Sequence, residues 1–519
     1  MIVGLFICYE TSIEQVVGEN YEYFPGDFED GRFNTYILEH DHQWFMGEVD
    51  SYWSAPFMYP EEDVITYSDN LLGAAPFYSF YRVIGYDREV SFQLWYVTMQ
   101  LFCFIAAYWF LWWCFKDPYS AALGAMIFTI SIAMQSQIGH AQILPRFPVP
   151  LTIWFCLLFQ KHKKAIYFVL SATLLIYQFY CGMYLGFFLL IPYSILIISI
   201  ISIEYKAYFQ LVKKRKWMLT VVIGSILNLL LFLPLILPYL ERSKQVAPKA
   251  YEDVINTVPT VKSFFFSTGH SYTWKSLEEV GIKYEAFWDH QIFPGGIAML
   301  SMIAFFIFGI ALFILKKWKK KKYDLPKFLI PVAIMIAATF LLFIRYQGHS
   351  FYHIVFQIPG FNSMRSITRI INIELLFFAF AAAFLLSKLL KRVSLFSLPI
   401  FIVFAYLLVL DNQVSDDGLH RRLVSEGRER IDPLIEKMKH LEPGTIVSVE
   451  VDSLIDPASR YQLDAMMASQ YLHLKCINGY SAMAPDYFDR YWNNPNPESR
   501  IFWINLRGVN PDEVMVIPY

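Results

Sequence analysis

The sequence predicts an all-α polytopic integral membrane bundle of about 10–11 spans, with a long first outer loop and a small α/β outer C-terminal domain. Three observations predict this class. Of the 519 residues, 56% are hydrophobic, 18% are aromatic and only 17% are charged, whereas soluble domains contain roughly 25% charged residues. Many apolar runs approach the roughly 20 residues that cross a bilayer. The Lys and Arg residues are concentrated in alternate connections between these runs.

The apolar runs can be threaded alternately through a membrane, and Glu374 is the one charged residue inside them. The connections on one side of this threading hold 19 Lys or Arg in 34 residues, and those on the other side hold 13 in 165. The positive-inside rule then places the long loops and the tail outside the cytoplasm. The runs lie at 92–115, 118–139, 147–160, 165–179, 181–203, 217–240, 293–315, 328–344, 370–387 and 394–410.

Three regions follow from this pattern. Residues 1–91 are predicted to hold a partial first span and an acidic first outer loop, 92–410 the transmembrane bundle, and 411–519 an extracytoplasmic α/β domain. The apolar stretch Met1–Tyr9 is too short to span, so we expect it to be the outer end of a first membrane helix, with a re-entrant segment as the alternative. Two helices of the first loop, Gly31–Met46 and Asn70–Ile84, are apolar enough to lie along the membrane surface.

The tail after residue 411 has the patterning of a soluble domain. It predicts helices at 428–440 and 457–471 and strands at 445–451 and 514–517. The formal net charge of -2 leaves no basic surplus for a nucleic-acid partner. Most of the six cysteines lie in apolar segments, so no disulfide framework is implied.

The acidic stretch at the beginning of the first predicted loop helix is the main candidate for chemistry. It contains Asp27, Glu29 and Asp30 within four residues. One explanation is capping, because helix N-termini favour acidic groups. Another is that one carboxylate is the general base for an acceptor hydroxyl or amine. Paired carboxylates can also hold a divalent cation, although no metal ligand set is assigned.

Cations that could bind a phosphate group lie far downstream of the acidic stretch. Arg365 and Arg369 are four residues apart and are predicted to share one face at the outer end of a helix. Guanidinium groups bind phosphate through two parallel hydrogen bonds, and a helix N-terminus adds its own donors. Snorkelling to lipid headgroups is the alternative. Arg146, between Pro145 and Pro148, is a second phosphate candidate.

Several other polar residues are candidates for contacts with a donor or an acceptor. His140 and Gln142 follow an apolar helix, where a histidine is either part of a hydrogen-bonded structure or assists proton movement. His40 belongs to His40-Asp41-His42, whose members point in different directions on a helix and so do not converge on one metal ion. Asp69 is predicted to cap the second loop helix, and contact with substrate is its alternative role.

An ordered series of short motifs resembles bacterial multi-pass membrane proteins of the GT-C (C-type, polyprenyl-phosphate-sugar dependent) glycosyltransferase superfamily. The series spans most of the chain, and a short first apolar run is its main departure. The motifs are Gly26-Asp27, Asp30-Gly31-Arg32-Phe33-Asn34, Leu38-Glu39-His40, Trp53-Ser54-Ala55-Pro56-Phe57, Tyr67-Ser68-Asp69-Asn70-Leu71-Leu72-Gly73, Gly139-His140-Ala141-Gln142 and Asn478-Gly479-Tyr480-Ser481.

The resemblance implies a helix bundle in the bacterial cytoplasmic membrane, a sugar donor carried on polyprenyl phosphate, and a catalytic Asp or Glu in the first outer loop. Carried onto this sequence, the candidate bases are Asp27 and Asp30, and Asp30 is preferred because it directly precedes the helix. The expected reaction transfers a sugar to an extracytoplasmic glycan or lipid of the cell surface. Two rivals are a transporter or flippase of a lipid-linked glycan and a non-catalytic membrane assembly protein.

Overall fold

The computed structural model of the chain describes residues 1–246, 249–319, 326–451 and 457–519. Each predicted apolar run contains a helix, and the run at 118–139 is interrupted at Ser131. These helices are α5 (Arg88–Phe115), α6 (Pro118–Ile130) with α7 (Ile132–Gln135), α8 (Pro148–His162), α9 (Ala165–Cys181), α10 (Met183–Ile203), α12 (Arg215–Gln245), α14 (Gly296–Lys319), α15 (Leu329–Phe343), α17 (Ile371–Leu390) and α18 (Ser397–Asn412).

Six apolar helical segments within the described part of the chain are long enough to cross a membrane, and four further apolar helices are shorter. The chain therefore has the helical composition of a membrane protein, as the sequence predicts. The six segments are Arg88–Phe115, Pro118–Gln135, Ala141–His162, Met183–Ile203, Arg215–Gln245 and Ile367–Leu390, and the shorter helices are Ala165–Cys181, Gly296–Leu312, Leu329–Phe343 and Ser397–Asn412.

Local chemistry sets where two of these helices begin. The side chain of Asp87 accepts a hydrogen bond from the backbone N–H of Val90 at the start of α5. Asp117 does the same for Ser120 at the start of α6, where Pro118 occupies the first helical position. These residues satisfy donors that have no partner inside the helix.

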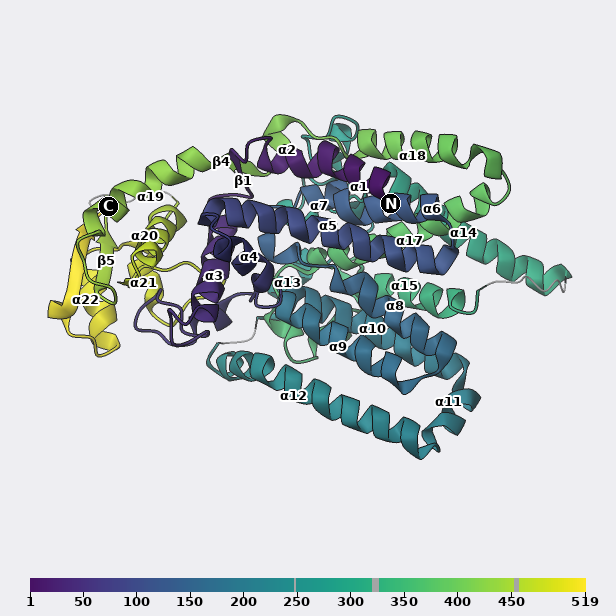
Figure 1. Cartoon of the computed structure of the whole chain (residues 1–519), viewed down its shortest axis with the longest axis horizontal. Coiled ribbons are helices and arrows are strands. Elements are labelled where there is room, and N and C mark those ends of the chain that lie inside the picture. The colour runs from purple at the N-terminus through teal and green to yellow at the C-terminus, as the bar shows by residue number, and fades with distance from the viewer. Residues whose placement is uncertain (247–248, 320–325, 452–456) are drawn as a thin grey trace.

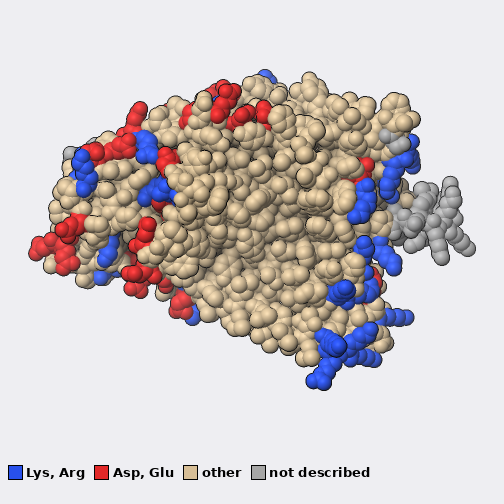
Figure 2. Space-filling model, viewed as in Figure 1, with Lys and Arg blue, Asp and Glu red and all other residues tan. Residues whose placement is uncertain are grey.

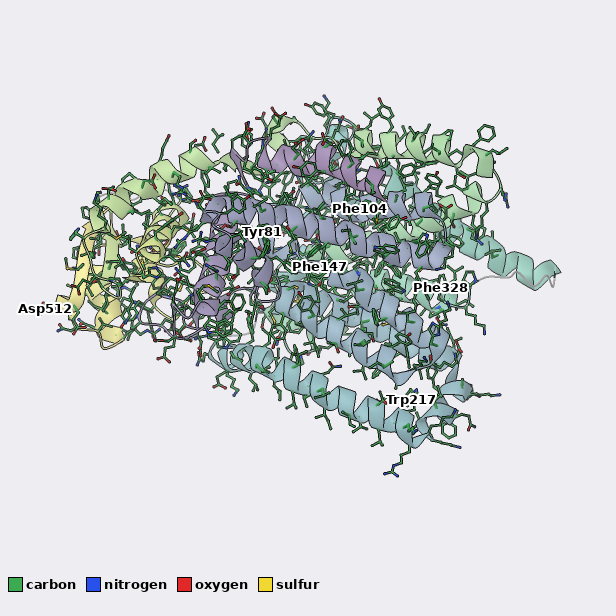
Figure 3. All side chains as sticks on the ribbon, viewed as in Figure 1. Tyr81, Phe104, Phe147, Trp217, Phe328 and Asp512 are labelled. Carbon is green, nitrogen blue, oxygen red and sulfur yellow. The ribbon has the colours of Figure 1, made fainter. Side chains whose placement is uncertain are left out.

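Helix α17 lies at the centre of the bundle, packed against α5, α6, α10 and α14. In the apolar 18-residue stretch of the segment Ile367–Leu390, which contains α17, 94% is buried inside the protein. In the corresponding stretch of α12, only 17% is buried. In Figure 1, α12 lies along one edge of the bundle, where it packs on α9. Aromatic side chains fill the spaces between helices, including Phe104, Phe147 and Phe328 (Figure 3). A helix that exposes apolar side chains on most faces is suited to a lipid environment.

Charged side chains are separated along the long axis of the molecule. Figure 2 shows Lys and Arg gathered at one end of the bundle, around α11 (Tyr205–Val212), and most Asp and Glu toward the other end. A broad band between them carries few charged side chains on this face. The predicted basic connection 316–327 lies partly outside the described residues. This separation matches the alternation of charge that the sequence predicts.

The first loop differs from its prediction in two respects, the burial of its first helix and the start of its second. Helix α1 (Ile2–Cys8) continues through a π-helical turn at Tyr9–Ile13 into α2 (Glu14–Val17). The first loop helix, α3 (Asp30–Phe45), is buried on all sides from Gly31 to Gln43. The prediction that α3 lies along the membrane surface is wrong, because the bundle and the tail cover it from opposite sides (Figure 1). Helix α4 (Ala75–Val83) begins five residues later than expected and exposes apolar side chains in its last turn.

The tail contains every element predicted for it. Its small parallel sheet has the strand order β6-β5-β7, with Ile446 of the central strand opposite Val514. Sequence reasoning missed the short strands β4 (Arg421–Leu423) and β6 and two helices. The elements are α19 (Val424–Met438), β5 (Ile446–Glu450), α20 (Ser459–Tyr471), β6 (Lys475–Cys476), α21 (Phe488–Asn493), α22 (Pro497–Leu506) and β7 (Val514–Pro518).

Buried polar contacts attach the tail to α3. The guanidinium group of Arg32 lies 2.5 Å from the carboxylate of Asp464 on α20, and both side chains are buried. The side chain of Gln470 donates to the carbonyl oxygen of Tyr36 at 2.9 Å. A short antiparallel pair, β1 (Tyr23–Pro25) with β4 (Arg421–Leu423), joins the two chain segments just before α3. The start of α3 is therefore held by segments some 400 residues away in sequence.

Candidate functional site

The acidic stretch forms the turn that begins α3. The carboxylate of Asp27 accepts hydrogen bonds from the backbone N–H groups of Glu29 at 3.0 Å and Gly31 at 3.1 Å. The capping explanation therefore applies to Asp27, which satisfies donors at the helix start. Asp30 is the first residue of the helix, and its carboxylate is left free to contact other parts of the chain.

The carboxylate of Asp30 joins three segments of the chain. Nδ1 of His140 lies 2.6 Å from Oδ2 of Asp30. The hydroxyl group of Tyr480, from the tail, donates to Oδ1 at 2.7 Å. The side chains of Asp30 and His140 remain 21% and 35% exposed, so solvent reaches the pair. The site lies between the helix bundle and the tail, near the start of α3 (Figure 1).

His140 is held by the turn that follows α7. Its backbone N–H donates to the carbonyl oxygen of Gln137 at 2.9 Å, and the side chain of Gln137 accepts from Asn372 at 2.9 Å. A Cβ atom at Gly139 would lie 3.4 Å from the free oxygen of Asp27. The turn that carries His140 therefore lies directly against the acidic stretch.

Tyr480 is held by the loop between β6 and α21. The side chain of Asn478 accepts from the backbone N–H of Val449 at 2.8 Å and donates to its carbonyl oxygen at 3.0 Å. The backbone N–H of Gly479 donates to Gln462 at 3.1 Å. These bonds attach the loop to the sheet of the tail. The loop in turn positions the hydroxyl group of Tyr480 to donate to Asp30. Tyr480 belongs to the motif Asn478-Gly479-Tyr480-Ser481, but its residue type and spacing alone indicate no role for it.

Two of the site carboxylates have pKa values shifted in opposite directions. Burial by itself would raise the pKa of Asp30, but the hydrogen bond and charge of His140, the hydroxyl group of Tyr480 and the charge of Arg369 together hold it well below its usual range. Burial raises the pKa of Asp27, although the backbone N–H groups of Gly31 and Glu29 oppose the shift. Asp30 is therefore a fixed negative charge at neutral pH.

Arg369 supplies an available cation beside this charge. Its side chain is 8% exposed, and its guanidinium group lies 5.3 Å from the ring centre of Tyr184. It forms no ion pair or side-chain hydrogen bond with any residue that the structure describes. Its charge lowers the pKa of both Asp30 and Asp69, which places it within electrostatic range of the two carboxylates.

Arg365 does not share a helix face with Arg369, so that prediction is wrong. The helical segment begins only at Ile367, because Ser366 has an extended backbone conformation. The backbone of Arg365 is instead held by Tyr184, which accepts from its N–H at 3.0 Å, and by Thr257, which donates to its carbonyl oxygen at 2.8 Å. Its side chain is exposed.

Asp69 caps a different helix from the one predicted. Its carboxylate accepts from the backbone N–H of Met183 and so caps α10, whereas α4 begins at Ala75. The other carboxylate oxygen is buried without a partner among the described residues. Burial raises the pKa of Asp69 to about 7. A Cβ atom at Gly182, between α9 and α10, would lie 3.0 Å from the carbonyl oxygen of Gln142 and 3.8 Å from Oδ1 of Asp69, so both residues lie next to this break.

The structure assigns structural roles to two other predicted contact residues. The side chain of Gln142 is buried and accepts from Asn34 at 3.0 Å, and Asn34 also donates to the carbonyl oxygen of Asp30 at 2.6 Å. His40 is buried farther along α3, where Nε2 lies 2.8 Å from the carbonyl oxygen of Tyr52. Burial lowers the pKa of His40 to about 4. His40 is therefore not at the site.

The neighbours of His40 point elsewhere, as the sequence predicts. His42 contacts Ser79, and the carboxylate of Asp41 is fully buried without a hydrogen-bond partner in the described structure. No group of three or more His, Cys, Asp or Glu side chains in the described ranges is arranged to hold a metal ion. The divalent cation thus stays a prediction that rests on Asp27 and Asp30 alone.

Arg146 is not available to a lipid phosphate, which corrects the prediction for this residue. Its side chain is fully buried and donates to the carbonyl oxygen of Thr129 at 3.3 Å. Its guanidinium group lies 4.7 Å from the ring centre of Phe128. The turn around Pro145 and Pro148 directs the side chain into the helix bundle, where the aromatic face partly compensates its charge.

One further residue beside the site escaped sequence reasoning. The carbonyl oxygen of His420 accepts from the backbone N–H of Gly26 at 2.8 Å, which brings β4 next to the acidic stretch. Surrounding protein atoms, and then the charge of His140, lower the pKa of His420 to about 4, although its ring remains exposed. An isolated histidine in the tail carries no local sequence signal for this position.

No protein-family model matches the sequence, and no curated protein matches it either. The chemistry of the site must therefore be argued from its geometry. Because Asp30 is ionised, Nδ1 of His140 carries the proton that joins the two side chains. A neutral imidazole in this tautomer presents Nε2 as a proton acceptor. The fold and the site together define a polytopic helical membrane protein with a solvent-accessible carboxylate–histidine pair, within electrostatic range of a guanidinium group that has no acidic partner among the described residues.

Proposed function

We propose that the protein is a membrane glycosyltransferase of the GT-C type, which moves a sugar from a polyprenyl-phosphate donor to a cell-surface acceptor on the extracytoplasmic side. The observation that carries the proposal is the contact between Asp30 and His140, within electrostatic range of Arg369. Three of the motifs that resemble this superfamily, separated widely in sequence, contribute Asp30, His140 and Tyr480 to one site.

The reaction needs a proton acceptor and a cation. The acceptor hydroxyl attacks the anomeric carbon of the sugar, its proton passes to Nε2 of His140, and the bond between the sugar and the phosphate oxygen breaks. The polyprenyl phosphate leaves with the bonding electrons. Asp30 stabilises the positive charge that forms on His140, and Arg369 stabilises the charge that returns to the phosphate. This pair refines the expectation that Asp30 alone is the base.

The proposed side of the membrane follows from charge. Lys and Arg gather at the end of the bundle away from the tail (Figure 2), and such an end is typical of the cytoplasmic side. The site lies toward the opposite end, where nucleotide sugars are absent and a lipid must carry the donor. A bacterial cytoplasmic membrane and a cell-envelope acceptor are parts of the same proposal.

The test uses purified protein in lipid nanodiscs, a panel of polyprenyl-phosphate hexoses, and envelope lipids and glycans as acceptors. We expect Asp30→Asn to lower transfer by about 10²–10⁴-fold, the range for loss of acid–base catalysis. Asp41→Asn is the matched control, because it makes the same substitution on the same helix away from the site. Full transfer by purified Asp30→Asn would remove the proposed role of this residue.

Transport of a lipid-linked glycan is the second candidate. It is favoured by Arg146, in the turn before α8, and Glu374, inside α17, which are both buried and have side-chain atoms without partners among the described residues. Polar residues in such positions often mark a transport path. Movement of a labelled lipid-linked glycan across proteoliposome membranes, without covalent transfer and unaffected by Asp30→Asn, would favour this candidate over the transferase.

A further inference from the structure

A polar pocket with a volume of about 320 Å³ lies on the surface between α2, the loop at Tyr272 and the segment that joins α18 to β4. This volume is at the lower end of the range of roughly 300–1,000 Å³ that is usual for small-molecule sites. We call it the Tyr272 pocket, and its lining includes Gln15, Tyr272, Gln413, Asp416, Leu419 and Arg421.

Hydrogen bonds to the backbone hold the walls of the Tyr272 pocket together. The backbone N–H of Tyr272 donates to the carbonyl oxygen of Gln413 at 3.2 Å. The side chain of Arg421 donates to the carbonyl oxygen of Gln15, and its guanidinium group lies 3.8 Å from the ring centre of Tyr23. Three segments that are far apart in the sequence are therefore bonded to one another around this space.

Three side chains of the lining are free to bind a ligand. Tyr272 is 66% exposed, and the side-chain amides of Gln15 and Gln413 form no hydrogen bond within the described part of the chain. An amide group presents a donor and an acceptor side by side, which suits two neighbouring hydroxyl groups of a sugar. The face of an aromatic ring packs well against the C–H groups of a sugar ring. This combination indicates a saccharide ligand.

The charge around the Tyr272 pocket indicates that this saccharide is uncharged. Arg421 is the one cation among the lining residues, and the carboxylate of Asp416 lies 3.7 Å from it. Glu10, Glu14 and Glu19 lie within electrostatic range of one another on the neighbouring α1–α2 segment. Figure 2 shows acidic side chains gathered over this part of the surface. A phosphate or carboxylate on the ligand would be repelled by this negative potential.

One strand connects the Tyr272 pocket to the carboxylate–histidine pair. His420 stands between the lining residues Leu419 and Arg421. Its carbonyl oxygen accepts from the backbone N–H of Gly26, next to the acidic stretch, at 2.8 Å. After burial, the charge of His140 is the largest cause of the lowered pKa of His420, so the two rings lie within electrostatic range. A ligand that extends from the pocket along the exposed ring of His420 therefore approaches His140.

We propose that the Tyr272 pocket binds an uncharged sugar unit of the acceptor glycan, with the rest of the glycan passing His420 toward His140. The proposal rests on the proposed glycosyltransferase function and adds the class of the acceptor, a neutral glycan. Tyr272 packs against the face of the sugar ring, and Gln15 and Gln413 form hydrogen bonds with its hydroxyl groups.

The first test measures the binding of small saccharides to the full chain in nanodiscs by saturation-transfer NMR. The neutral probes are maltose, lactose and cellobiose, and cellobiuronic acid is the anionic counterpart of cellobiose. We expect Tyr272→Ala to weaken binding of the neutral probes by roughly tenfold, the upper end for contacts with an aromatic ring. Gln413→Ala should weaken it by roughly fivefold, the value of one hydrogen bond. Cellobiuronic acid should bind more weakly than cellobiose.

Tyr346→Ala is the matched control, because Tyr346 is 68% exposed on β2 (Arg345–Tyr346) and does not line the pocket. It should leave saccharide binding unchanged. If Tyr272→Ala misfolds, Gln15→Ala removes an exposed side chain of the lining and must also weaken binding. The pocket assignment is overturned if no neutral probe binds, if the folded lining variants bind like wild type, or if cellobiuronic acid binds more tightly than cellobiose.

A transfer assay with the envelope glycan as acceptor separates this proposal from the proposed function. Tyr272→Ala should raise KM for the acceptor by roughly tenfold and leave KM for the donor unchanged. Transfer with an unchanged acceptor KM in this variant would contradict the pocket assignment and leave the transferase proposal standing. Saccharide binding that depends on Tyr272, without sugar transfer by the wild-type protein, would uphold the sugar site and contradict the proposed function.

Discussion

Nδ1 of His140 lies 2.6 Å from Oδ2 of Asp30, although 110 residues separate them in sequence. A short hydrogen bond between an imidazole and a carboxylate fixes the tautomer and orientation of the ring. Asp30 also accepts from Tyr480, so its second oxygen is occupied and the carboxylate cannot rotate freely. The imidazole is the more exposed member of the pair, and its Nε2, which has no hydrogen-bond partner among the described residues, is the group that can exchange a proton with a substrate.

The first prediction concerns the coupling of this pair. His140→Gln and Asp30→Asn should each reduce transfer by about 10²-fold or more, and the double variant should be little worse than either single one. Residues that act as one unit give such non-additive losses. The measurement is kcat/KM for donor turnover in nanodiscs. Multiplicative losses in the double variant would show that the two side chains act independently.

The second prediction concerns Tyr480. Removal of its hydroxyl group by Tyr480→Phe deletes a hydrogen bond that holds the pKa of Asp30 low, so this pKa rises. The titration of the Asp30 carboxyl, followed by NMR, should therefore move to higher pH, while activity at neutral pH falls by about tenfold, the value of one hydrogen bond to a charged group. Tyr487→Phe, an exposed tyrosine in the same tail, is the control. An Asp30 titration that does not move would show that the hydroxyl group does not act on Asp30.

Much of the fold could be predicted because membrane helices are encoded locally. The length of each apolar run and the charges that flank it can be read directly from the sequence, and each run corresponds to a helix. The burial of α3 could not be predicted in this way. Its apolar pattern suits a membrane surface as well as a protein interior, and the ion pair of Arg32 with Asp464 depends on a residue 432 positions away.

The candidate site was predictable only in part for the same reason. Asp30 and His140 have local signals, an acidic helix start and a motif after an apolar run. Tyr480 reaches Asp30 across 450 residues, and no local pattern indicates that contact. Arg365 and Arg369 are four residues apart, which predicts that they share one face of a helix. The helical segment begins at Ile367, between the two residues, so they do not. Periodicity cannot locate a helix start when no capping residue marks it.

The third prediction concerns Arg369, whose guanidinium group lies within electrostatic range of Asp30 and has no acidic partner in the described part of the chain. Arg369→Gln should raise KM for the polyprenyl-phosphate donor by roughly 10–100-fold, which is the loss expected for charge-assisted hydrogen bonds to phosphate. Arg369→Lys should recover part of this loss because it keeps the charge but not the planar donor pair. Arg490→Gln, an exposed arginine in the tail, controls for a general loss of charge. An unchanged donor KM in Arg369→Gln would exclude a phosphate contact by this residue.

The last prediction uses the unusual titration of Asp69, whose pKa is raised by burial to about 7 from an ordinary value of 3.8. Between these two pH values the folded chain keeps a proton that the unfolded chain has lost. The contribution of Asp69 to stability is therefore largest below about pH 4 and is lost as the pH rises toward 7. In Asp69→Asn the side chain still accepts from Met183 but cannot ionise.

The melting temperature of Asp69→Asn, relative to wild type, should accordingly increase from pH 4 to pH 7 and level off above it. Asp63→Asn, at an exposed position of the same loop, should show no such trend. The other carboxylates stabilise the folded chain more as the pH rises, in wild type and variant alike. Their effect cancels when the melting temperature of the wild type is subtracted from that of the variant. A difference that stays flat across this range would mean that Asp69 is ionised throughout, with Arg369 close enough to compensate its burial fully.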